Sequence, residues 1–311
     1  MTDAINLSER KVILIKRRTR LEDLIARYNT AAQAKFYIEH MGSDFSDYLA
    51  EDAQYKSVLR QAEDAISALA RLHVVDREHL PNFIFGQSDI VVAVGQDGLV
   101  ANTLKYLSGQ PLVGVNPDNR RWDGVLLPFE AGDLGTVLPE VAASRRPVRE
   151  ITMAKVTLND GQELYAVNDL FIGQKTHVSA RYSIQISGKS EEQSSSGIIV
   201  STGLGASGWL KSIVEGASHV AGAKSRAKDV IPAQWDAESL QYTVREPFPS
   251  RSTGSELVFG QIARSRPLIV VSHMPENGVI FSDGIENDAL EFRSGIRATV
   301  GVADKKGVLV V

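Results

Sequence analysis

Short apolar runs alternate with amphipathic stretches along the first half of the chain. Lys11–Lys16 (KVILIK) is typical of a buried strand, and Asp89–Val94 (DIVVAV) is a continuous apolar run of the kind that parallel sheets bury on both faces. A short helix is predicted over Leu99–Leu107 and a further strand over Leu112–Val115. Strand, helix and strand at this spacing predict a βαβ unit, and therefore an α/β domain with a parallel sheet.

Helical patterns fill the stretch between the first two of these strands. Thr19 and Glu22 have the spacing of a capping box and precede an apolar stripe with helical period. A second helix is expected from about Ala31 to His40, and a longer one from about Asp44 to Leu72. The stripes are typical of core packing. Residues 31–72 are therefore predicted to be a helical insert in the α/β domain.

The pattern changes after about residue 148, where apolar and polar residues begin to alternate. Turn residues separate these runs, and Asn159-Asp160-Gly161 between two of them is a hairpin signal. The chain is therefore predicted to contain an α/β domain over residues 1–147 and, from residue 148, a second domain that is rich in antiparallel β-structure.

Composition narrows the functional classes. The chain has 311 residues, of which 43% are hydrophobic and 23% charged, and this length suits two domains. Its net charge of −4 gives no bulk attraction to nucleic acid or to an anionic membrane, so neither partner is expected. The absence of cysteine excludes disulfides, thiolate metal sites and a thiol nucleophile.

Targeting and metal binding leave no signal in the sequence. Neither a signal peptide nor a membrane span is expected, because no apolar stretch has the required length, and a cytoplasmic protein is predicted. The six histidines show no metal-ligand spacing. No metal site built from protein side chains is therefore predicted.

The first candidate for chemistry follows the strand Asp89–Val94, which Gly95-Gln96-Asp97-Gly98 connects to the next helix. Glycine permits a sharp turn and the close approach of a ligand, and the amides at a helix start attract phosphate. Asp97 would then accept a proton from an attacking hydroxyl or help to hold Mg²⁺. A plain strand–helix turn with Asp97 as the helix N-cap fits the same spacing.

A second glycine-rich segment, Gly203–Gly208 (GLGASG), follows the apolar run Gly197–Ser201 and precedes a possible helix over Trp209–Ala217. It matches the dinucleotide-binding pattern GxGxxG, so a dehydrogenase is an alternative function. Against this alternative, the segment lies in the region predicted to be β-rich. No second strand ending in an acidic residue is evident about 20 positions later, as that fold requires.

An ordered set of short motifs connects the two domains to one family. The motifs are GQDG at Gly95–Gly98, GVN at Gly114–Asn116, Asn168-Asp169, STGLGASGW at Ser201–Trp209 and Asp283-Gly284. This order resembles the NAD kinase family, which has GGDG, G-[VI]-N, an Asn-Glu pair, a Gly- and Thr-rich loop and a late Asp-Gly. The similarity covers most of the chain and is nearer to the mitochondrial-type branch.

The resemblance implies a fold and a reaction. The fold is a Rossmann-like α/β N-terminal domain and a β-sandwich-like C-terminal domain over residues 148–284, with residues 285–311 returning to the first domain. The reaction is transfer of the γ-phosphoryl group of ATP to the 2′-hydroxyl of the adenosine ribose of NAD, with Mg²⁺ bound through the phosphates. A homodimer or higher homo-oligomer is also implied.

Roles for individual residues follow from the resemblance and from their chemistry. Asp97 is the expected general base, and Asn168, Asp169 and Asp283 are expected to bind NAD. Nucleotide or phosphate contacts are expected from Gly95, Gln96, Gly98, Asn116, Thr202, Gly203, Gly205 and Ser207. Arg17, Arg18 and Arg20 are candidates for cations near the phosphates, although a solvated charge run also fits them. Trp209 is a candidate for stacking on a base, although helix-face aromatics are more often core residues.

The chain departs from the family pattern at several of these positions. Gln96 replaces the second glycine, Leu99 stands in place of the usual threonine, and Asp169 is one methylene shorter than the family's glutamate. The alternatives therefore stay open: a related kinase acting on a sugar or lipid alcohol, a non-catalytic nucleotide sensor, or an NAD(P)-dependent oxidoreductase using Gly203–Gly208.

Overall fold

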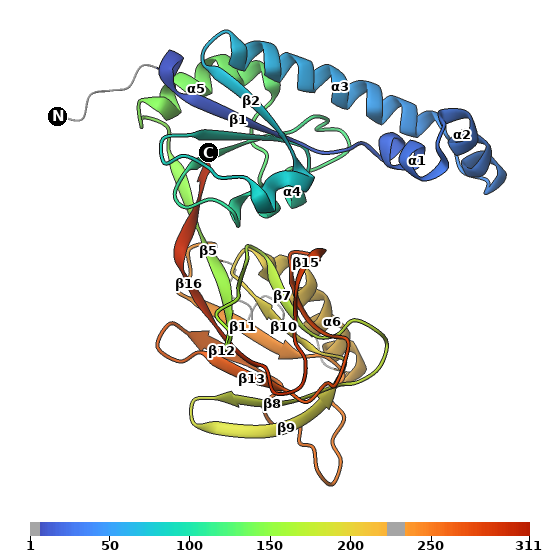
Figure 1. Cartoon of the computed structure of the whole chain (residues 1–311), viewed down its shortest axis with the longest axis vertical. Coiled ribbons are helices and arrows are strands. Elements are labelled where there is room, and N and C mark those ends of the chain that lie inside the picture. The colour runs from blue at the N-terminus through green and yellow to red at the C-terminus, as the bar shows by residue number, and fades with distance from the viewer. Residues whose placement is uncertain (1–6, 223–233) are drawn as a thin grey trace. The chain divides into compact units, whose positions relative to one another are not determined.

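The computed structural model describes residues 7–222 and 234–311, which divide into two compact units (Figure 1). The first unit extends to Arg149 and is completed by Val308–Val311 from the end of the chain. The second unit comprises Glu150–Gly307. Within the two described ranges, no helix combines the length and the apolarity that a membrane span requires.

The first unit is an α/β domain. Its strands and α-helices are β1 (Lys11–Lys16), α1 (Arg20–Tyr28), α2 (Ala31–His40), α3 (Ser46–Ser67), β2 (Arg71–Asp76), β3 (Ile90–Val94), α4 (Asp97–Leu104), β4 (Pro111–Val115) and α5 (Leu134–Ala142). Short 3-10 turns lie at Leu7–Glu9, Arg77–Asn82 and Ala131–Asp133. The four strands are parallel in the order β2-β1-β3-β4, which confirms the predicted βαβ unit.

Helices cover both faces of this parallel sheet, which explains the continuous apolar runs of its inner strands. On one face, Val12, Leu14 and Val92 pack against α3 and α5 in a single core cluster. The alternate side chains of β1, Ile13 and Ile15, are equally buried on the other face. Figure 1 shows α4 on the side of the sheet away from α3 and α5.

The helices α2 and α3 lie within the predicted insert 31–72, but the last turn of that insert was predicted wrongly. Its longest helix, α3, ends at Ser67 and not near Leu72, and the next residues form β2, which pairs in parallel with β1. This strand is at the edge of the sheet and is mostly exposed or half-buried, so it carries no apolar run that would have indicated it. Pairing with β1 is a long-range contact that the local pattern does not contain.

The second unit is built almost entirely from strands. Its elements are β5 (Val148–Leu158), β6 (Glu163–Ala166), β7 (Asp169–Gln174), β8 (Ala180–Ile186), β9 (Lys189–Ser195), β10 (Ile198–Ser201), α6 (Trp209–Val220), β11 (Ser239–Val244), β12 (Phe259–Ala263), β13 (Leu268–Ser272), β14 (Gly278–Ser282), β15 (Ile285–Glu291) and β16 (Arg297–Val310), with a 3-10 turn at Gly205–Ser207. The hairpin predicted at Asn159–Gly161 is confirmed, because it joins the antiparallel strands β5 and β6.

Two sheets of the second unit share one core. A six-stranded antiparallel sheet has the order β12-β11-β10-β7-β14-β15, and β5, β6, β8, β9, β13 and β16 form the other layer. Leu170 and Ile172 of β7 lie in the same buried cluster as Ile184 of β8 and Val270 of β13. This arrangement is a β-sandwich, as predicted.

The end of the chain is divided differently from the predicted segment 285–311. β15 pairs with β14, and β16 pairs with β13 through Arg297–Val300, so both strands belong mainly to the second unit. Val308–Val311 alone return to the first unit, where Val308 and Leu309 pair with the start of β4. The hydrogen-bonded ladders, which the sequence pattern does not show, decide this boundary.

Gly114 in β4 provides a test of how tightly the following loop packs. A Cβ atom at this position would lie 2.0 Å from the backbone oxygen of Leu126. Gly114→Ala is therefore expected to lower the free energy of unfolding by about 1–3 kcal/mol. Gly135→Ala in α5 is the control, since its Cβ would meet no atom within 4 Å and alanine favours a helix by about 1 kcal/mol. Urea unfolding that shows equal effects for the two variants would contradict this packing.

Candidate functional site

The bend Gly95–Gly98 lies at the carboxyl end of β3. The Gly95 amide donates a hydrogen bond to Val115 O (3.2 Å), and α4 begins at Asp97 with Gln96 as its N-cap. Asp97 is thus the first helical residue, and its alternative role as the N-cap is wrong. Gly98 is exposed, and a Cβ there would meet no atom within 4 Å. The first amides of a helix have no partner within it, so the bend offers donors and open space beside a carboxylate.

The Asp97 carboxylate is held by the loop that follows β4. Its Oδ1 accepts a hydrogen bond from the Leu126 amide (2.7 Å). Asn116 shapes this loop, because its Nδ2 donates to Trp122 O (3.1 Å) and its Oδ1 accepts from the Asp118 amide (3.0 Å). The structure therefore shows a structural use for the Asn116 side chain, and its contact with a nucleotide stays a prediction.

The three arginines after β1 have different environments. Arg18 is exposed and forms an ion pair with Glu78 (3.2 Å), as expected of a solvated charge. Arg17 and Arg20 both bind Glu51, a carboxylate of α3 that is only 2% exposed. The Arg17 side chain is itself 11% exposed, so the solvated charge run does not describe it.

In the second unit, one carboxylate organises the start of β7. Asp283 accepts hydrogen bonds from the amides of Val167 (3.0 Å), Asn168 (2.6 Å) and Asp169 (3.2 Å). The Asp283 amide donates in return to Asp169 O (2.9 Å), and Asp283 has a left-handed backbone with φ of 53°. The structure thus brings together the three residues predicted to bind NAD, and it shows that Asp283 fixes the backbone of the other two.

Asp169 is a carboxylate in an unfavourable environment. Burial raises the pKa of Asp169 to about 7; a hydrogen bond with Ser201 acts in the opposite direction, and the nearby charge of Asp283 adds to the rise. Its Oδ1 is buried without a hydrogen-bond partner among the described residues. Strongly perturbed carboxylates of this kind cluster at functional sites.

The glycine-rich loop after β10 is mostly packed against its own unit. The Thr202 hydroxyl donates to Val167 O (2.6 Å) and accepts from the Gly205 amide (3.1 Å). A Cβ on Gly203 would lie 1.8 Å from Gln234 O, and one on Gly205 would lie 2.2 Å from Asn168 O. These glycines allow close backbone packing.

Ser207, in contrast with the residues before it, is exposed. Its hydroxyl donates a hydrogen bond to Leu204 O (3.4 Å). Ligand contact by Thr202, Gly203, Gly205 and Ser207 stays a prediction.

The setting of this loop disfavours a dehydrogenase. A dinucleotide-binding GxGxxG motif lies in a βαβ unit with parallel strands. Here β10 pairs antiparallel with both of its neighbours, β7 and β11. The match at Gly203–Gly208 therefore lacks the structural context that the alternative requires.

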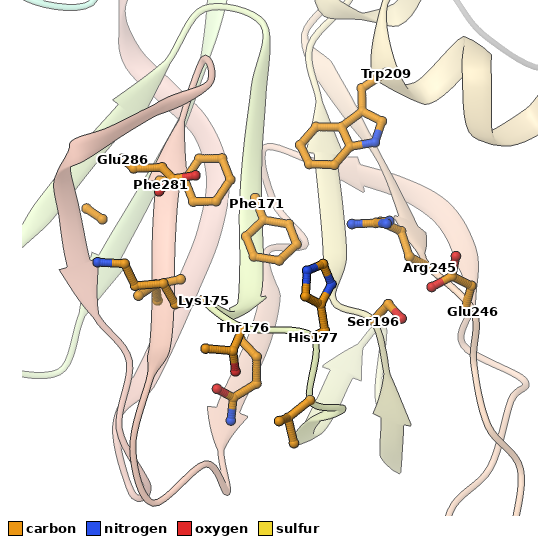
Figure 2. A pocket seen from close by; sticks show the side chains of 14 residues that line it. Phe171, Lys175, Thr176, His177, Ser196, Trp209, Arg245, Glu246, Phe281 and Glu286 are labelled. Atoms are coloured by element: carbon orange, nitrogen blue, oxygen red, sulfur yellow. The ribbon is translucent and has the colours of Figure 1, made fainter. Parts of the chain in front are cut away.

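An aromatic pocket, which the sequence did not reveal as a unit, opens on the six-stranded sheet beside α6 (Figure 2). Leu170 and Ile172 point into the sandwich core, so Phe171 between them points outward. Its ring stacks on Trp209 (centroids 5.9 Å apart, planes at 7°) and on Phe281 (4.8 Å, 29°). The cavity has a volume of about 440 Å³.

Charged side chains surround this aromatic floor. Arg245 lies over the Trp209 ring, 5.4 Å from its centroid. Figure 2 shows Lys175 and Glu286 on one side of the pocket and Arg245 with Glu246 on the other. An aromatic floor with cations at the edge suits a planar ring that carries an anionic substituent. Trp209 was a candidate for stacking, and the lining position supports that candidate over a purely core role.

Comparison with known proteins agrees with these features. No protein-family model matches the chain. It is 28% identical over 254 residues to a probable NADH kinase from Oryza sativa subsp. japonica. The aligned residues cover 74% of this chain and 71% of that protein.

Two solved structures share its fold. One is an NAD kinase from Archaeoglobus fulgidus in complex with ATP, with 15% identity, a TM-score of 0.56, and coverage of 97% of this chain and 93% of that one. The other is the yeast NADH kinase complexed with NADH, with 14% identity, a TM-score of 0.54, and coverage of 98% and 84%. The chain is thus a two-domain α/β and β-sandwich protein with the NAD kinase fold. Its resemblance to the NAD kinase family is confirmed.

The raised pKa of Asp169 predicts a dependence of stability on pH. The unfolded carboxyl loses its proton near pH 4, whereas the folded one keeps it to about pH 7. Between these values the folded state binds more protons than the unfolded state. The contribution of this carboxyl group to the free energy of unfolding is therefore fully present below pH 4 and is lost as the pH rises to 7. Asp169→Asn removes this loss, so its free energy of unfolding is expected to exceed that of the wild type by a difference that grows above pH 4 and reaches about 4 kcal/mol near pH 7. Urea unfolding measures it, and a difference that is independent of pH would contradict the assignment.

Proposed function

We propose that this chain is an ATP-dependent kinase that phosphorylates the 2′-hydroxyl of the adenosine ribose of NAD or NADH and produces NADP or NADPH. The observation that carries the proposal is the Gly95–Gly98 bend, which offers amides at a helix start, an exposed glycine and the Asp97 carboxylate at the end of a parallel strand. Similarity to a probable NADH kinase supports the activity, and the common fold with an ATP complex and an NADH complex agrees with it.

Asp97 is the proposed general base. One of its oxygens accepts a hydrogen bond from the Leu126 amide, which fixes the orientation of the carboxylate. The other oxygen is then available to the acceptor hydroxyl. The hydroxyl oxygen forms a bond to the γ-phosphorus, the bond to the oxygen of ADP breaks, and the hydroxyl proton passes to Asp97. Phosphoryl transfer of this kind depends mainly on positioning and on stabilisation of charge.

Mg²⁺ bound through the phosphates completes the proposed site. Such an ion would be held chiefly by phosphate oxygens. A homodimer and a cytoplasmic location are part of the proposal on the resemblance and the sequence alone.

The aromatic pocket of the second unit is the proposed subsite for a base of the dinucleotide. Stacking on Trp209 and Phe171 accommodates any planar base, and Arg245 and Lys175 lie where they can pair with a phosphate. Asn168 and Asp169 provide an amide and a carboxyl for ribose hydroxyls. The alternative acceptors, sugars and lipid alcohols, have no aromatic ring to stack.

Replacing the base tests the proposed chemistry. Asp97→Asn keeps an oxygen for the Leu126 amide but cannot take a proton, so kcat for NADP formation from ATP, Mg²⁺ and NAD is expected to fall at least 10²-fold. Asp123→Asn is the control, because Asp123 is an exposed carboxylate on the loop that carries Leu126. A folded wild-type protein that binds ATP but makes no NADP or NADPH would indicate another acceptor or a nucleotide sensor.

Removing the stacking surface tests the proposed subsite. Trp209→Ala is expected to raise KM for NAD about tenfold or more and to leave KM for ATP unchanged, because stacking on a base is worth about 1–3 kcal/mol. Trp209→Phe keeps an aromatic ring, and its KM for NAD should lie between those of the wild type and Trp209→Ala. Phe248→Ala, a 66% exposed aromatic residue of the same unit, is the control. An unchanged KM for NAD in Trp209→Ala would exclude the pocket as the base subsite.

A further inference from the structure

One side chain of the helical insert ties together the ends of two neighbouring strands in the first unit. The Tyr55 hydroxyl of α3 donates to Val94 O, at the end of β3 (3.0 Å), and accepts from the Arg17 amide, just after β1 (2.9 Å). Tyr55 is 2% exposed, and burial raises its pKa to about 12, so the hydroxyl keeps its proton. The residue that it holds, Val94, leads directly into Gly95.

The Arg17 side chain lies beside the same bend. Its guanidinium binds Glu51 Oε1 (3.0 Å) and lies over the rings of Tyr55 (5.0 Å) and Trp122 (5.6 Å). A Cβ placed on Gly95 would lie 2.8 Å from Leu99 Cδ2 and 3.7 Å from Arg17 Cδ, so the Arg17 side chain is one of the groups that bound the space beside Gly95. Glu51 and Tyr55 are four residues apart on α3, so both reach Arg17 from one face of the helix.

The contact with Trp122 extends this arrangement to the carboxylate. Trp122 belongs to the loop after β4, where Asn116 Nδ2 binds its backbone oxygen (3.1 Å). The same loop provides the Leu126 amide that binds Asp97 Oδ1 (2.7 Å). A displacement of Arg17 would therefore reach Asp97 through this loop.

We propose that Glu51 and Tyr55 are positioning residues for the Gly95–Gly98 bend, and that this is a function of the helical insert. Glu51 acts through the Arg17 side chain, and Tyr55 acts through Val94 O and the Arg17 amide. The inference rests on the proposed binding of a nucleotide phosphate at the bend. Tyr55 holds backbone groups at the two strand ends, and Glu51 holds the Arg17 side chain beside them. Loss of the Tyr55 hydroxyl would leave Val94 O and the Arg17 amide unpaired in a buried position, and the strand ends would move to recover partners.

Hydrogen exchange of the bend tests the positioning without reference to activity. The amides of Gly95, Leu99 and Val100 are hydrogen-bonded and should exchange about five- to tenfold faster in Tyr55→Phe and Glu51→Gln. Tyr182→Phe is the matched control for the tyrosine, since that hydroxyl is also buried and bonded but lies in the second unit. Asp89→Asn is the control for the carboxylate. Asp89 is 4% exposed, pairs with Lys11 of β1, and directly precedes β3, at the end of that strand away from the bend.

Kinetics of the same variants separates positioning from general stability. Tyr55→Phe and Glu51→Gln are expected to raise KM for ATP about fivefold with KM for NAD unchanged, and Glu51→Asp should restore part of the loss. The controls should lower the melting temperature without changing KM for ATP. Unchanged exchange at the bend, or a lower melting temperature with an unchanged KM for ATP, would overturn the inference. A wild-type protein that makes no NADP would refute the proposed function, and the exchange rates would still decide whether Glu51 and Tyr55 position the bend.

Discussion

The hydrogen bonds that hold the carboxyl ends of β1, β3 and β4 at one edge of the parallel sheet are the constraint on which the first unit depends. The ladder fixes strands along their length, but the groups just beyond each end need partners from elsewhere, since buried backbone groups without partners are costly. Tyr55 provides them for Arg17 and Val94, and the Gly95 amide joins Val115. The bend that is proposed to bind phosphate starts from these fixed points.

The second unit uses a carboxylate for the same purpose. Asp283 accepts from three successive amides at the start of β7 and thereby places Asn168 and Asp169. Burial is the main cause of the raised pKa of Asp169, and the charge of Asp283 adds to it, so the residue that orders the backbone also affects the protonation of its neighbour. In both units, residues that are distant in sequence hold the candidate groups, and this preorganisation is what phosphoryl transfer needs.

The candidate site was predictable where its signal was local. Gly95–Gly98 could be identified because a buried strand, a glycine bend and a helix start follow each other directly along the chain. The function of Gly203 and Gly205 could not be identified in this way. Their lack of a side chain serves close packing against Gln234 and Asn168, and sequence spacing does not distinguish such packing from room for a ligand.

By itself, the sequence determined the two-domain architecture, the βαβ unit and the position of the bend at Asp97, because hydrophobic period and turn chemistry act between neighbouring residues. Only the tertiary structure decided that β2 is a strand and that Arg17 is nearly buried on Glu51. It also brought Phe171, Trp209 and Phe281 together around a pocket. These features depend on contacts between segments far apart in the chain, whose free energy exists only once the fold has formed.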